Sequence, residues 1–304
     1  FMNQSFYDKL TSVIAKERVY VDEPMSRHTT FRVGGPADFF VTPKAKEEVR
    51  DVIRICKEAG MPYYIIGNGS NLLVSDAGYR GVIVQICKEM NEVKVEGDLV
   101  KAQAGALLSG IAAKALGAEL SGFEFASGIP GTIGGACVMN AGAYGGEMKD
   151  VLESVTVLTG EGKIIELGRN ELELGYRTSV IAKKGYIVLG AVLKLERGDG
   201  EKIKTYMDEL KEKRVTKQPL EYPSAGSTFK RPEGYFAGKL IQDSGLKGFT
   251  VGGAQVSEKH SGFVINKGNA TAADVMELIR QVTAKVKEDT GVTMEPEVKQ
   301  IGEF

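Results

Sequence analysis

Glycine, gathered into two loops, is the feature that most restricts how this chain can fold. The chain has 38 glycines in 304 residues, and two runs stand out, GNGSN (67–71) and GIPGTIGGA (128–136). The second run has the spacing GxxGxxGG, which excludes both the GxGxxG of a Rossmann unit and a Walker A loop. Because glycine has no Cβ, such loops let the backbone approach a flat ring or a pyrophosphate. Either loop alone is compatible with an ordinary turn, but together they predict that one long ligand is clasped from two sides.

The overall composition excludes several classes of function. The 39 Lys and Arg nearly balance the 40 Asp and Glu, for a net charge of −1, so no basic field recruits nucleic acid or an anionic membrane. No apolar run approaches the roughly 20 residues that span a bilayer. Cys56, Cys87 and Cys137 form no CxxC pair, and with only two histidines, His28 and His260, a His-rich metal site is excluded. These features predict a cytoplasmic protein with reduced thiols, no metal site and no nucleic-acid or membrane partner.

The order of expected elements indicates the α+β class with more than one subdomain, because strands and helices do not alternate strictly. Periodicity and flanking glycines predict helices over 44–59, 106–116, 201–214 and 271–289. Strands are expected at 62–67, 81–86, 99–105, 186–196, 250–256 and 262–266, with a hairpin over 151–167. The charged, glycine-containing run RGDGE (197–201) is an expected domain boundary.

Seven motifs occur in a fixed order along the chain: RHTTFRVGGPAD (27–38), GNGSNLLVSD (67–76), SGIPGTIGGACVMNAGAYGGE (127–147), GYRTS (175–179), AGSTFKRP (225–232), GLKG (245–248) and EPEVKQIG (295–302). As an ordered set they closely resemble the UDP-N-acetylenolpyruvoylglucosamine reductase (MurB) family over nearly the whole chain. The short run between GYRTS and YIVLGAVL (186–193) resembles the second type of that family, which lacks an extra tyrosine-bearing loop.

The resemblance implies a fold, a reaction and two nucleotide cofactors. The fold would be the vanillyl-alcohol-oxidase-like (PCMH-type) FAD-binding fold, with FAD subdomains at 1–80 and 81–199 and a substrate-binding domain at 200–304. The reaction would be the NADPH-dependent reduction of UDP-N-acetylglucosamine enolpyruvate to UDP-N-acetylmuramate, a step of peptidoglycan precursor synthesis. FAD would be bound non-covalently, and NADPH would be the co-substrate that supplies the hydride.

The resemblance also assigns roles to individual residues. Ser227 would protonate C2 of the enolpyruvyl group, while Arg177 and Glu297 would bind the adjacent carboxylate. FAD would contact residues of both glycine loops and the segment after the second loop: Gly67, Asn68, Gly69, Ser70, Asn71, Leu72, Ser127, Gly128, Ile129, Pro130, Gly131, Thr132, Gly134, Gly135, Ala136, Asn140, Gly142 and Ala143. The UDP moiety would be held by basic side chains: Arg214, Lys217, Lys230, Lys247 and His260. Arg231 departs from the asparagine found at its position in some members, so the resemblance assigns it no role.

Simpler interpretations remain open from the residues alone. A serine in a Ser/Gly-rich segment is usually a turn former, and the basic residues are each compatible with solvated surface charges. Three other functions compete: a sugar or hydroxyacid oxidase of the same fold, a non-catalytic nucleotide-binding module, and a serine hydrolase. Many such oxidases tether FAD covalently through a His or Cys next to the first glycine loop, and GNGSN contains neither. AGSTF lacks the second glycine of the hydrolase motif GxSxG.

Overall fold

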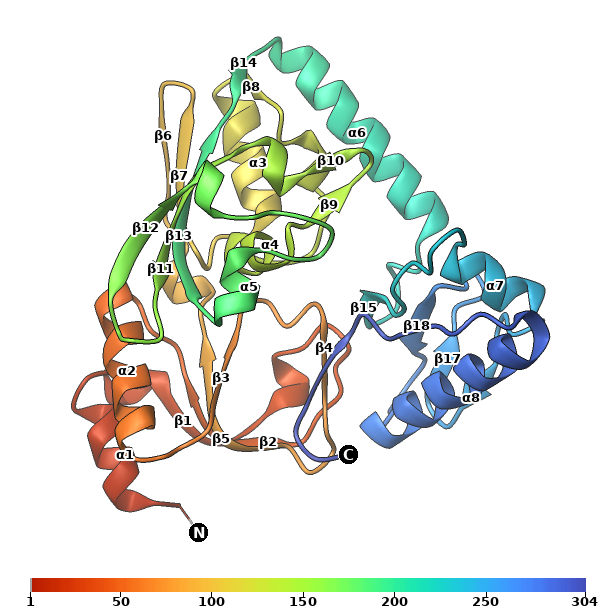
Figure 1. The fold of residues 1–304 in the computed structure, drawn as a ribbon, viewed down its shortest axis with the longest axis horizontal. Coiled ribbons are helices and arrows are strands. Elements are labelled where there is room, and N and C mark those ends of the chain that lie inside the picture. The colour runs from red at the N-terminus through yellow and green to blue at the C-terminus, as the bar shows by residue number, and fades with distance from the viewer. Residues whose placement is uncertain (1) are drawn as a thin grey trace. The chain divides into compact units, whose positions relative to one another are not determined.

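The computed structural model describes residues 2–304, which fold into two compact units (Figure 1). The first unit runs to Val21 and includes Phe39–Asn68 and Gly81–Lys213. The second contains Asp22–Asp38, Gly69–Arg80 and Arg214–Phe304. Each unit is therefore assembled from three separate segments of the chain. The division into three parts at residues 80 and 199 stays a prediction.

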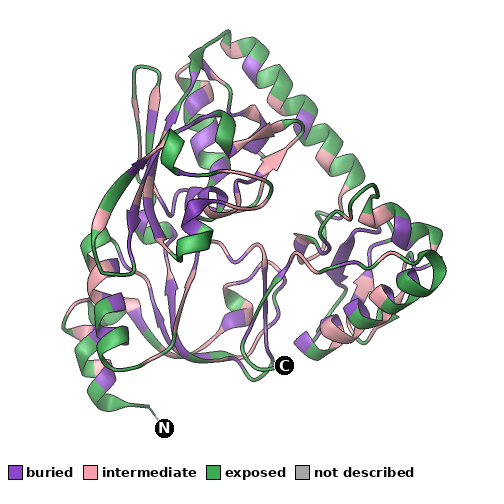
Figure 2. Ribbon diagram, in the orientation of Figure 1, coloured by how far each residue is buried: buried purple, intermediate pink, exposed green. Residues whose placement is uncertain are grey.

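The first unit is centred on an antiparallel sheet of five strands in the order β12-β11-β13-β7-β6. Helices α3 and α4 pack on it, and β11 and β13 run through the interior, as the burial colours of Figure 2 show. The strands are β6 (Val93–Glu96), β7 (Leu99–Gln103), β11 (Leu152–Leu158), β12 (Ile164–Gly168) and β13 (Ile187–Lys194), and the helices are α3 (Leu108–Gly117), α4 (Ile133–Met139) and α5 (Val180–Lys184). Two short ribbons flank this sheet: β9 (Gly142–Ala143) with β10 (Gly146–Glu147), and β8 (Leu120–Ser121) with β14 (Glu196–Arg197).

A second sheet, in the order β1-β2-β5-β3, precedes it in the chain. Its strands are β1 (Val19–Pro24), β2 (Pro36–Val41), β3 (Tyr63–Ile66) and β5 (Tyr79–Gln85), and β3 and β5 are parallel. Helix α2 (Lys46–Glu58) and helix α1 (Gln4–Thr11) contact each other. The apolar face of α2 is buried in the same core as α1 and the five-stranded sheet. This core fixes β3, and with it the position of the first glycine loop.

The second unit has its own core, built on the antiparallel sheet β15-β18-β17-β16. Helix α8 (Ala272–Thr290) packs on β16 and β17, and α7 (Ala237–Asp243) packs on α8. The sheet strands are β15 (Ser224–Ser227), β16 (Thr250–Val251), β17 (Ala254–Val256) and β18 (Phe263–Asn266). A parallel ribbon joins β4 (Leu72–Val74), which follows the first glycine loop, to β19 (Lys299–Ile301).

Asp76 ties the first glycine-loop motif to the longest helix of this unit. Its two carboxylate oxygens accept hydrogen bonds from the backbone N–H groups of Ala272 (2.8 Å) and Ala273 (3.0 Å). Helix α8 thus has a second cap besides Thr271, whose hydroxyl accepts from the N–H of Asp274. These bonds satisfy donors that a helix start leaves open. The aspartate at the end of GNGSNLLVSD therefore has a structural role, the capping of α8.

Most predicted elements are confirmed, and two differ in detail. The helices expected at 44–59, 201–214 and 271–289 correspond to α2, α6 (Gly200–Lys217) and α8. The helix expected at 106–116 is α3, which includes the flanking Gly117 as its last residue. The left-handed residue after the helix is Glu119, with φ 55°, and not this glycine. The strand expected over 250–256 is a hairpin of β16 and β17, because Gly252 turns the chain with φ 53°.

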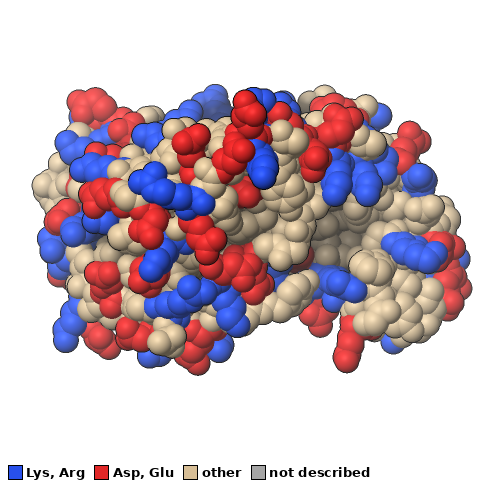
Figure 3. All heavy atoms as spheres, turned by 90° about the horizontal axis from the view of Figure 1, so that it is seen from above, with Lys and Arg blue, Asp and Glu red and all other residues tan. Residues whose placement is uncertain are grey.

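On the face drawn in Figure 3, Lys and Arg lie among Asp and Glu, and charge of neither sign dominates that face. Within residues 2–304, no helix has both the length and the apolar character needed to cross a membrane.

Candidate functional site

A cavity of about 520 Å³ in the first unit is lined by residues from both glycine loops. Gly67 reaches it from the end of β3, and Thr132, Gly134 and Gly135 reach it from the start of α4. The remaining walls come from β3, the end of α5 and β13, and are mostly apolar. A largely apolar cavity with a few polar groups is typical of a cofactor site.

The two glycine loops touch each other at Gly67 and Thr132. A Cβ on Gly67 would lie 2.4 Å from the hydroxyl oxygen of Thr132, so a side chain at position 67 would collide with the second loop. Thr132 is buried and caps α4, accepting from the N–H of Gly135 at 3.3 Å. Gly135 differs, because a Cβ there would meet only the Thr132 hydroxyl, at 3.7 Å. Position 135 therefore faces open space at the cavity, whereas Gly67 is required by packing.

Several cavity residues were not singled out from the sequence. They come from strand β3 (Tyr63, Tyr64, Ile65, Ile66), from α4 (Val138) and from the segment that joins α5 to β13 (Ile181, Ala182, Gly185, Tyr186, Ile187, Val188). Burial raises the pKa of Tyr64 above its ordinary value, so its phenol stays protonated at neutral pH and able to donate a hydrogen bond. The only sequence signal for the residues at 63–66 and 186–188 is that they belong to expected strands. That signal does not distinguish a cavity wall from core.

The turn that carries Arg177 is fastened to helix α4. The amide of Asn140, the left-handed C-cap of α4, donates to the carbonyl of Gly175 at 3.0 Å. The hydroxyl of Ser179 donates to the carbonyl of Val138 at 2.8 Å. Arg177 has φ 51°, and its guanidinium lies 5.6 Å from the centre of the Tyr176 ring. Arg177 therefore projects from a strained turn anchored to the helix of the second glycine loop.

Ser227 ends strand β15, directly after a bulge. Ser224 pairs with Ile265 and Ser227 with Phe263, so the register shifts between the two pairs. Gly226, inside the bulge, has φ 73°, a backbone conformation that favours glycine. Bulges commonly redirect a side chain at a functional site, and Ser227 is exposed whereas Thr228 is buried.

Backbone pairing places Glu297 next to Ser227 within the second unit. The N–H of Glu297 donates to the carbonyl of Thr228 at 2.8 Å. Phe229 and Pro296 form an isolated antiparallel bridge, and the N–H of Lys230 donates to the carbonyl of Glu295 at 2.8 Å. Two predicted catalytic residues, separated by 70 positions in sequence, are thus neighbours in space. Arg177, the third, belongs to the first unit.

The residues predicted to bind UDP all lie in the second unit. Lys217 is the last residue of α6, and Lys230 lies 3.7 Å from Glu295 in an ion pair. Lys217, Lys230 and Lys247 are exposed, and Arg214 is half-buried. The predicted UDP-binding residues thus belong to the same unit as Ser227 and Glu297.

His260 is held in one orientation by its surroundings. Its Nδ1 accepts the N–H of Gly262 at 3.0 Å, and its ring packs edge-on against Phe263 with the ring centres 4.9 Å apart. Because Nδ1 accepts, the neutral ring carries its proton on Nε2. Burial lowers the pKa of His260 below its ordinary value. The ring can therefore donate from Nε2 while remaining uncharged.

A titration of the protein with the His28→Gln substitution should show a midpoint for His260 below about 6.5. Folding favours the neutral ring, so this residue's contribution to stability is complete above the unfolded-state pKa and is lost as the pH falls through the folded-state pKa. The shift of the remaining imidazole Cε1 proton in NMR spectra measures the midpoint directly. A midpoint at or above the ordinary value would contradict the assignment of Nδ1 as an acceptor.

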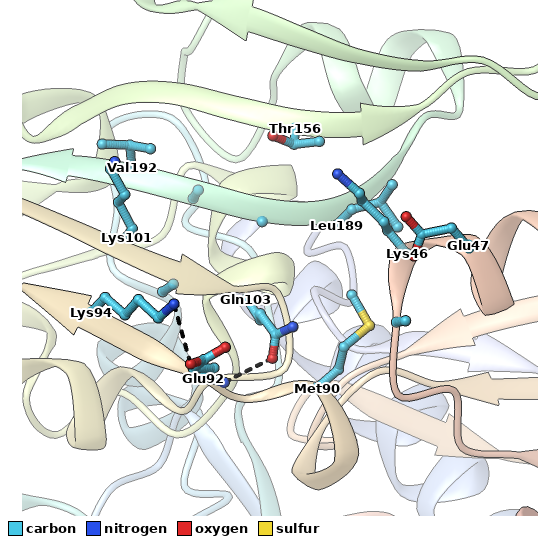
Figure 4. Close-up of a pocket in the computed structure, with 14 residues that line it drawn as sticks. Lys46, Glu47, Met90, Glu92, Lys94, Lys101, Gln103, Thr156, Leu189 and Val192 are labelled. Atoms are coloured by element: carbon cyan, nitrogen blue, oxygen red, sulfur yellow. Dashed lines mark hydrogen bonds and ion pairs between the residues drawn. The ribbon is translucent and has the colours of Figure 1, made fainter.

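A second cavity, of about 380 Å³, lies on the five-stranded sheet near the start of α2 and is shown in Figure 4. Lys46 and Glu47 come from α2, and Lys94, Lys101 and Gln103 from the sheet. Its charges are mixed, and Lys94 lies 3.6 Å from Glu92. None of the predicted site residues lines it, so the cavity with the glycine loops is the cofactor-site candidate.

Comparison with known proteins gives consistent matches for both parts of the chain. Residues 218–301 match the model of the UDP-N-acetylenolpyruvoylglucosamine reductase C-terminal domain, and residues 37–168 match that of an FAD binding domain. The UDP-N-acetylenolpyruvoylglucosamine reductase of Clostridioides difficile strain 630 is 52% identical over 301 residues, covering 99% of each chain. The crystal structure of MurB from Thermus caldophilus aligns with a TM-score of 0.79 at 38% identity, covering 93% of this chain and 97% of that one.

A more distant solved structure extends the match in fold alone. A variant of Phl p 4, described as a glucose oxidase, aligns with a TM-score of 0.51 at 16% identity, over 64% of this chain and 44% of that one. Together with the FAD binding domain match, these likenesses confirm the predicted fold class.

Proposed function

The chain belongs to the UDP-N-acetylenolpyruvoylglucosamine reductase family, and on that premise we propose that it reduces UDP-N-acetylglucosamine enolpyruvate to UDP-N-acetylmuramate with NADPH. It carries an FAD binding domain and is an FAD-dependent oxidoreductase of peptidoglycan precursor synthesis. The observation that best supports the chemistry is the backbone pairing that makes Ser227 and Glu297 neighbours.

FAD fits the residues that line the larger cavity. Two glycine loops meet there, Gly135 leaves space that a side chain would fill, and the walls are apolar enough to hold a ring system. We assign the pyrophosphate to residues 67–71 and 128–136. Bound there, FAD would supply the hydride chemistry, by which a hydride from NADPH would reach C3 of the enolpyruvyl group. No cysteine or histidine lies in either loop, in keeping with a non-covalent cofactor.

The protein's own residues would manage the charge and the proton. Hydride arrival at C3 leaves negative charge at C2 that spreads into the adjacent carboxylate. The guanidinium of Arg177 presents a fork of donors that suits this carboxylate, and the carboxyl group of Glu297 would supply a further hydrogen bond to it. The exposed hydroxyl of Ser227 gives its proton to C2. A hydroxyl is a weak acid, but a carbanion is basic enough to take the proton.

The UDP moiety is assigned to the second unit. Lys217, Lys230, Lys247 and Arg214 would neutralise the diphosphate, and Nε2–H of His260 would donate to it as an uncharged group. We further propose that the protein works in the cytoplasm, where nucleotide sugars and NADPH occur, and that it acts without nucleic acid.

The test is an anaerobic experiment on the flavin-loaded protein. NADPH should bleach the flavin absorbance, and UDP-N-acetylglucosamine enolpyruvate should restore it in the absence of oxygen. A sugar or hydroxyacid oxidase would instead be reoxidised by oxygen and would ignore the enolpyruvyl compound. A protein that stays colourless after incubation with FAD would favour a non-catalytic nucleotide-binding module.

Gly135→Val is expected to give a folded protein that has lost most of its flavin. Gly135 lies in helix α4 with open space before it, so the added side chain enters the cavity without meeting backbone. The measurement is flavin released by acid per mole of protein, together with the thermal unfolding midpoint.

Gly110→Val is the matched control, because Gly110 is an exposed helical glycine in α3 whose Cβ would meet no neighbour. It should keep its flavin with no loss of helix stability, because valine has a higher helix propensity than glycine. Equal flavin content in both variants would show that FAD does not occupy this cavity.

A further inference from the structure

One residue, Thr30, joins the first glycine loop to the strand that carries Ser227. The backbone N–H of Thr30 donates to the carbonyl of Gly69 at 3.0 Å, and its hydroxyl donates to the carbonyl of Ser224 at 2.7 Å. The hydroxyl oxygen also lies 3.4 Å from the Gly69 carbonyl. A hydroxyl has only one proton to donate, so the shorter contact, to Ser224, is the hydrogen bond. Thr30 thus bridges residue 69 and residue 224.

The contact falls where it can affect Ser227. β15 is an edge strand, and Ser224 is its first residue. Three residues later, across the bulge at Gly226, the same strand ends at Ser227. Phe31, next to Thr30, accepts the side-chain amide of Asn266 at its carbonyl (3.1 Å), and Asn266 belongs to β18, the neighbour of β15. The segment at 30–31 therefore holds the edge strand and its neighbour together.

The same loop is also bonded to the segment that carries Glu297. The carbonyl of Asn71 accepts the N–H of Lys299 at 2.9 Å, and its side-chain amide donates to the carbonyl of Glu297 at 3.4 Å. Residues 69–71 thus contact the Glu297 segment directly, whereas they reach β15 through Thr30. The link to β15 depends on one side-chain hydroxyl, that of Thr30, which can be removed without changing the side chain's size.

We propose that Thr30 is a positioning residue, which transmits the ordering of the loop at residues 67–71 to the hydroxyl of Ser227. The proposal rests on the proposed function, in which that loop holds FAD and Ser227 is the proton donor. When FAD orders the loop, Thr30 holds the start of β15 in place, and the bulge then points Ser227 at the substrate. Thr30 itself touches neither FAD nor substrate in this proposal.

Amide hydrogen exchange tests the link without any turnover. In the wild-type protein, adding FAD should slow exchange in peptides that cover residues 67–72 and also in those that cover 222–229. Thr30→Val should keep the first effect and lose the second. Thr30→Ser, which restores the hydroxyl, should recover both. Thr250→Val is the matched control, since the hydroxyl of Thr250 donates to a backbone carbonyl, that of Gly248, at 2.9 Å in the same unit.

Single-turnover kinetics test the consequence for catalysis. Thr30→Val should slow the reoxidation of pre-reduced enzyme by the enolpyruvyl substrate about 10- to 100-fold, the scale of a small misplacement of a reacting group. Reduction by NADPH should be unchanged, and Thr30→Ser should be close to wild type. In a Ser227→Ala background the Thr30→Val change should have little further effect, because Thr30 acts through Ser227.

The outcomes separate this proposal from the one it rests on. If FAD protects neither peptide of the wild-type protein, the assignment of the loop to FAD is wrong. If FAD protects both peptides equally in wild type and Thr30→Val, only the role of Thr30 is wrong. Additive effects of Thr30→Val and Ser227→Ala on reoxidation, or equal slowing of both half-reactions, would likewise overturn it.

Discussion

Ser227→Ala is expected to bind FAD, NADPH and substrate nearly as the wild type does, and to lose turnover by about 10²- to 10⁴-fold, the range that proton transfer contributes. The reason is that hydride addition at C3 without protonation at C2 leaves a carbanion that returns the hydride. Reduction of the flavin by NADPH does not involve C2 and should proceed at the wild-type rate. The decisive measurement is the single-turnover reoxidation of pre-reduced Ser227→Ala by the enolpyruvyl substrate.

Two further observations check the assignment of the proton donor. Ser227→Cys should recover part of the rate, because a thiol is also a proton source and is more acidic than a hydroxyl. In deuterated solvent, the wild-type product should carry deuterium at C2, delivered to one face only. A wild-type reoxidation rate in Ser227→Ala would remove Ser227 from the chemistry and leave it as the end of a bulged strand.

The elements with strong local patterns could be predicted from the sequence. The apolar face of α2, with Val49, Val52, Ile53 and Cys56, is buried as its helical spacing requires, and Gly291 ends α8 with φ 77°. Such local patterns could not predict how the chain divides into its two units. That division depends on pairings between distant segments, such as β4 with β19, that no local propensity encodes.

The two glycine loops were predicted to form the site, and the structure shows which of their glycines are needed by the fold and which leave space in the cavity. A glycine at 69 was expected to let the backbone approach a ligand. In the structure Gly69 has φ 66°, and a Cβ there would collide with the carbonyl of His28. Its substitution would therefore strain the fold whether or not FAD binds. Gly135, which the sequence pattern did not separate from its neighbours, is a cavity glycine at which an added Cβ would meet no backbone.

The neighbourhood of Ser227 and Glu297 shows what the motifs could and could not provide. Each residue was selected because its motif resembles a family motif, and nothing in the spacing of 70 residues indicates that they meet. They become neighbours because the chain returns after α8 and pairs residues 295–297 with 228–230. The segment of Thr30 shows the reverse case. Its motif was noted, but its bond to Ser224 depends on tertiary structure and could not be predicted.

Arg177→Met and Glu297→Met are each expected to slow reoxidation of the reduced enzyme by the enolpyruvyl substrate about 10²- to 10³-fold, the cost of removing one preorganised donor to a developing negative charge. Flavin reduction by NADPH should be nearly unchanged, because that step places no charge on the substrate carboxylate. Stopped-flow absorbance of the two half-reactions under anaerobic conditions gives both rates.

Matched controls make this expectation specific to the two positions. Arg197→Met and Glu288→Met make the same changes at exposed sites in β14 and α8, and both variants should behave as wild type in both half-reactions. Because Arg177 and Glu297 would act on one carboxylate, the double variant should lose less than the product of the two single losses. Equal slowing of both half-reactions in Arg177→Met would instead indicate damage to the cavity, since its turn is anchored to α4 through Asn140 and Ser179. A fully multiplicative loss in the double variant would mean that the two side chains stabilise separate charges, and Glu297 would then need another role.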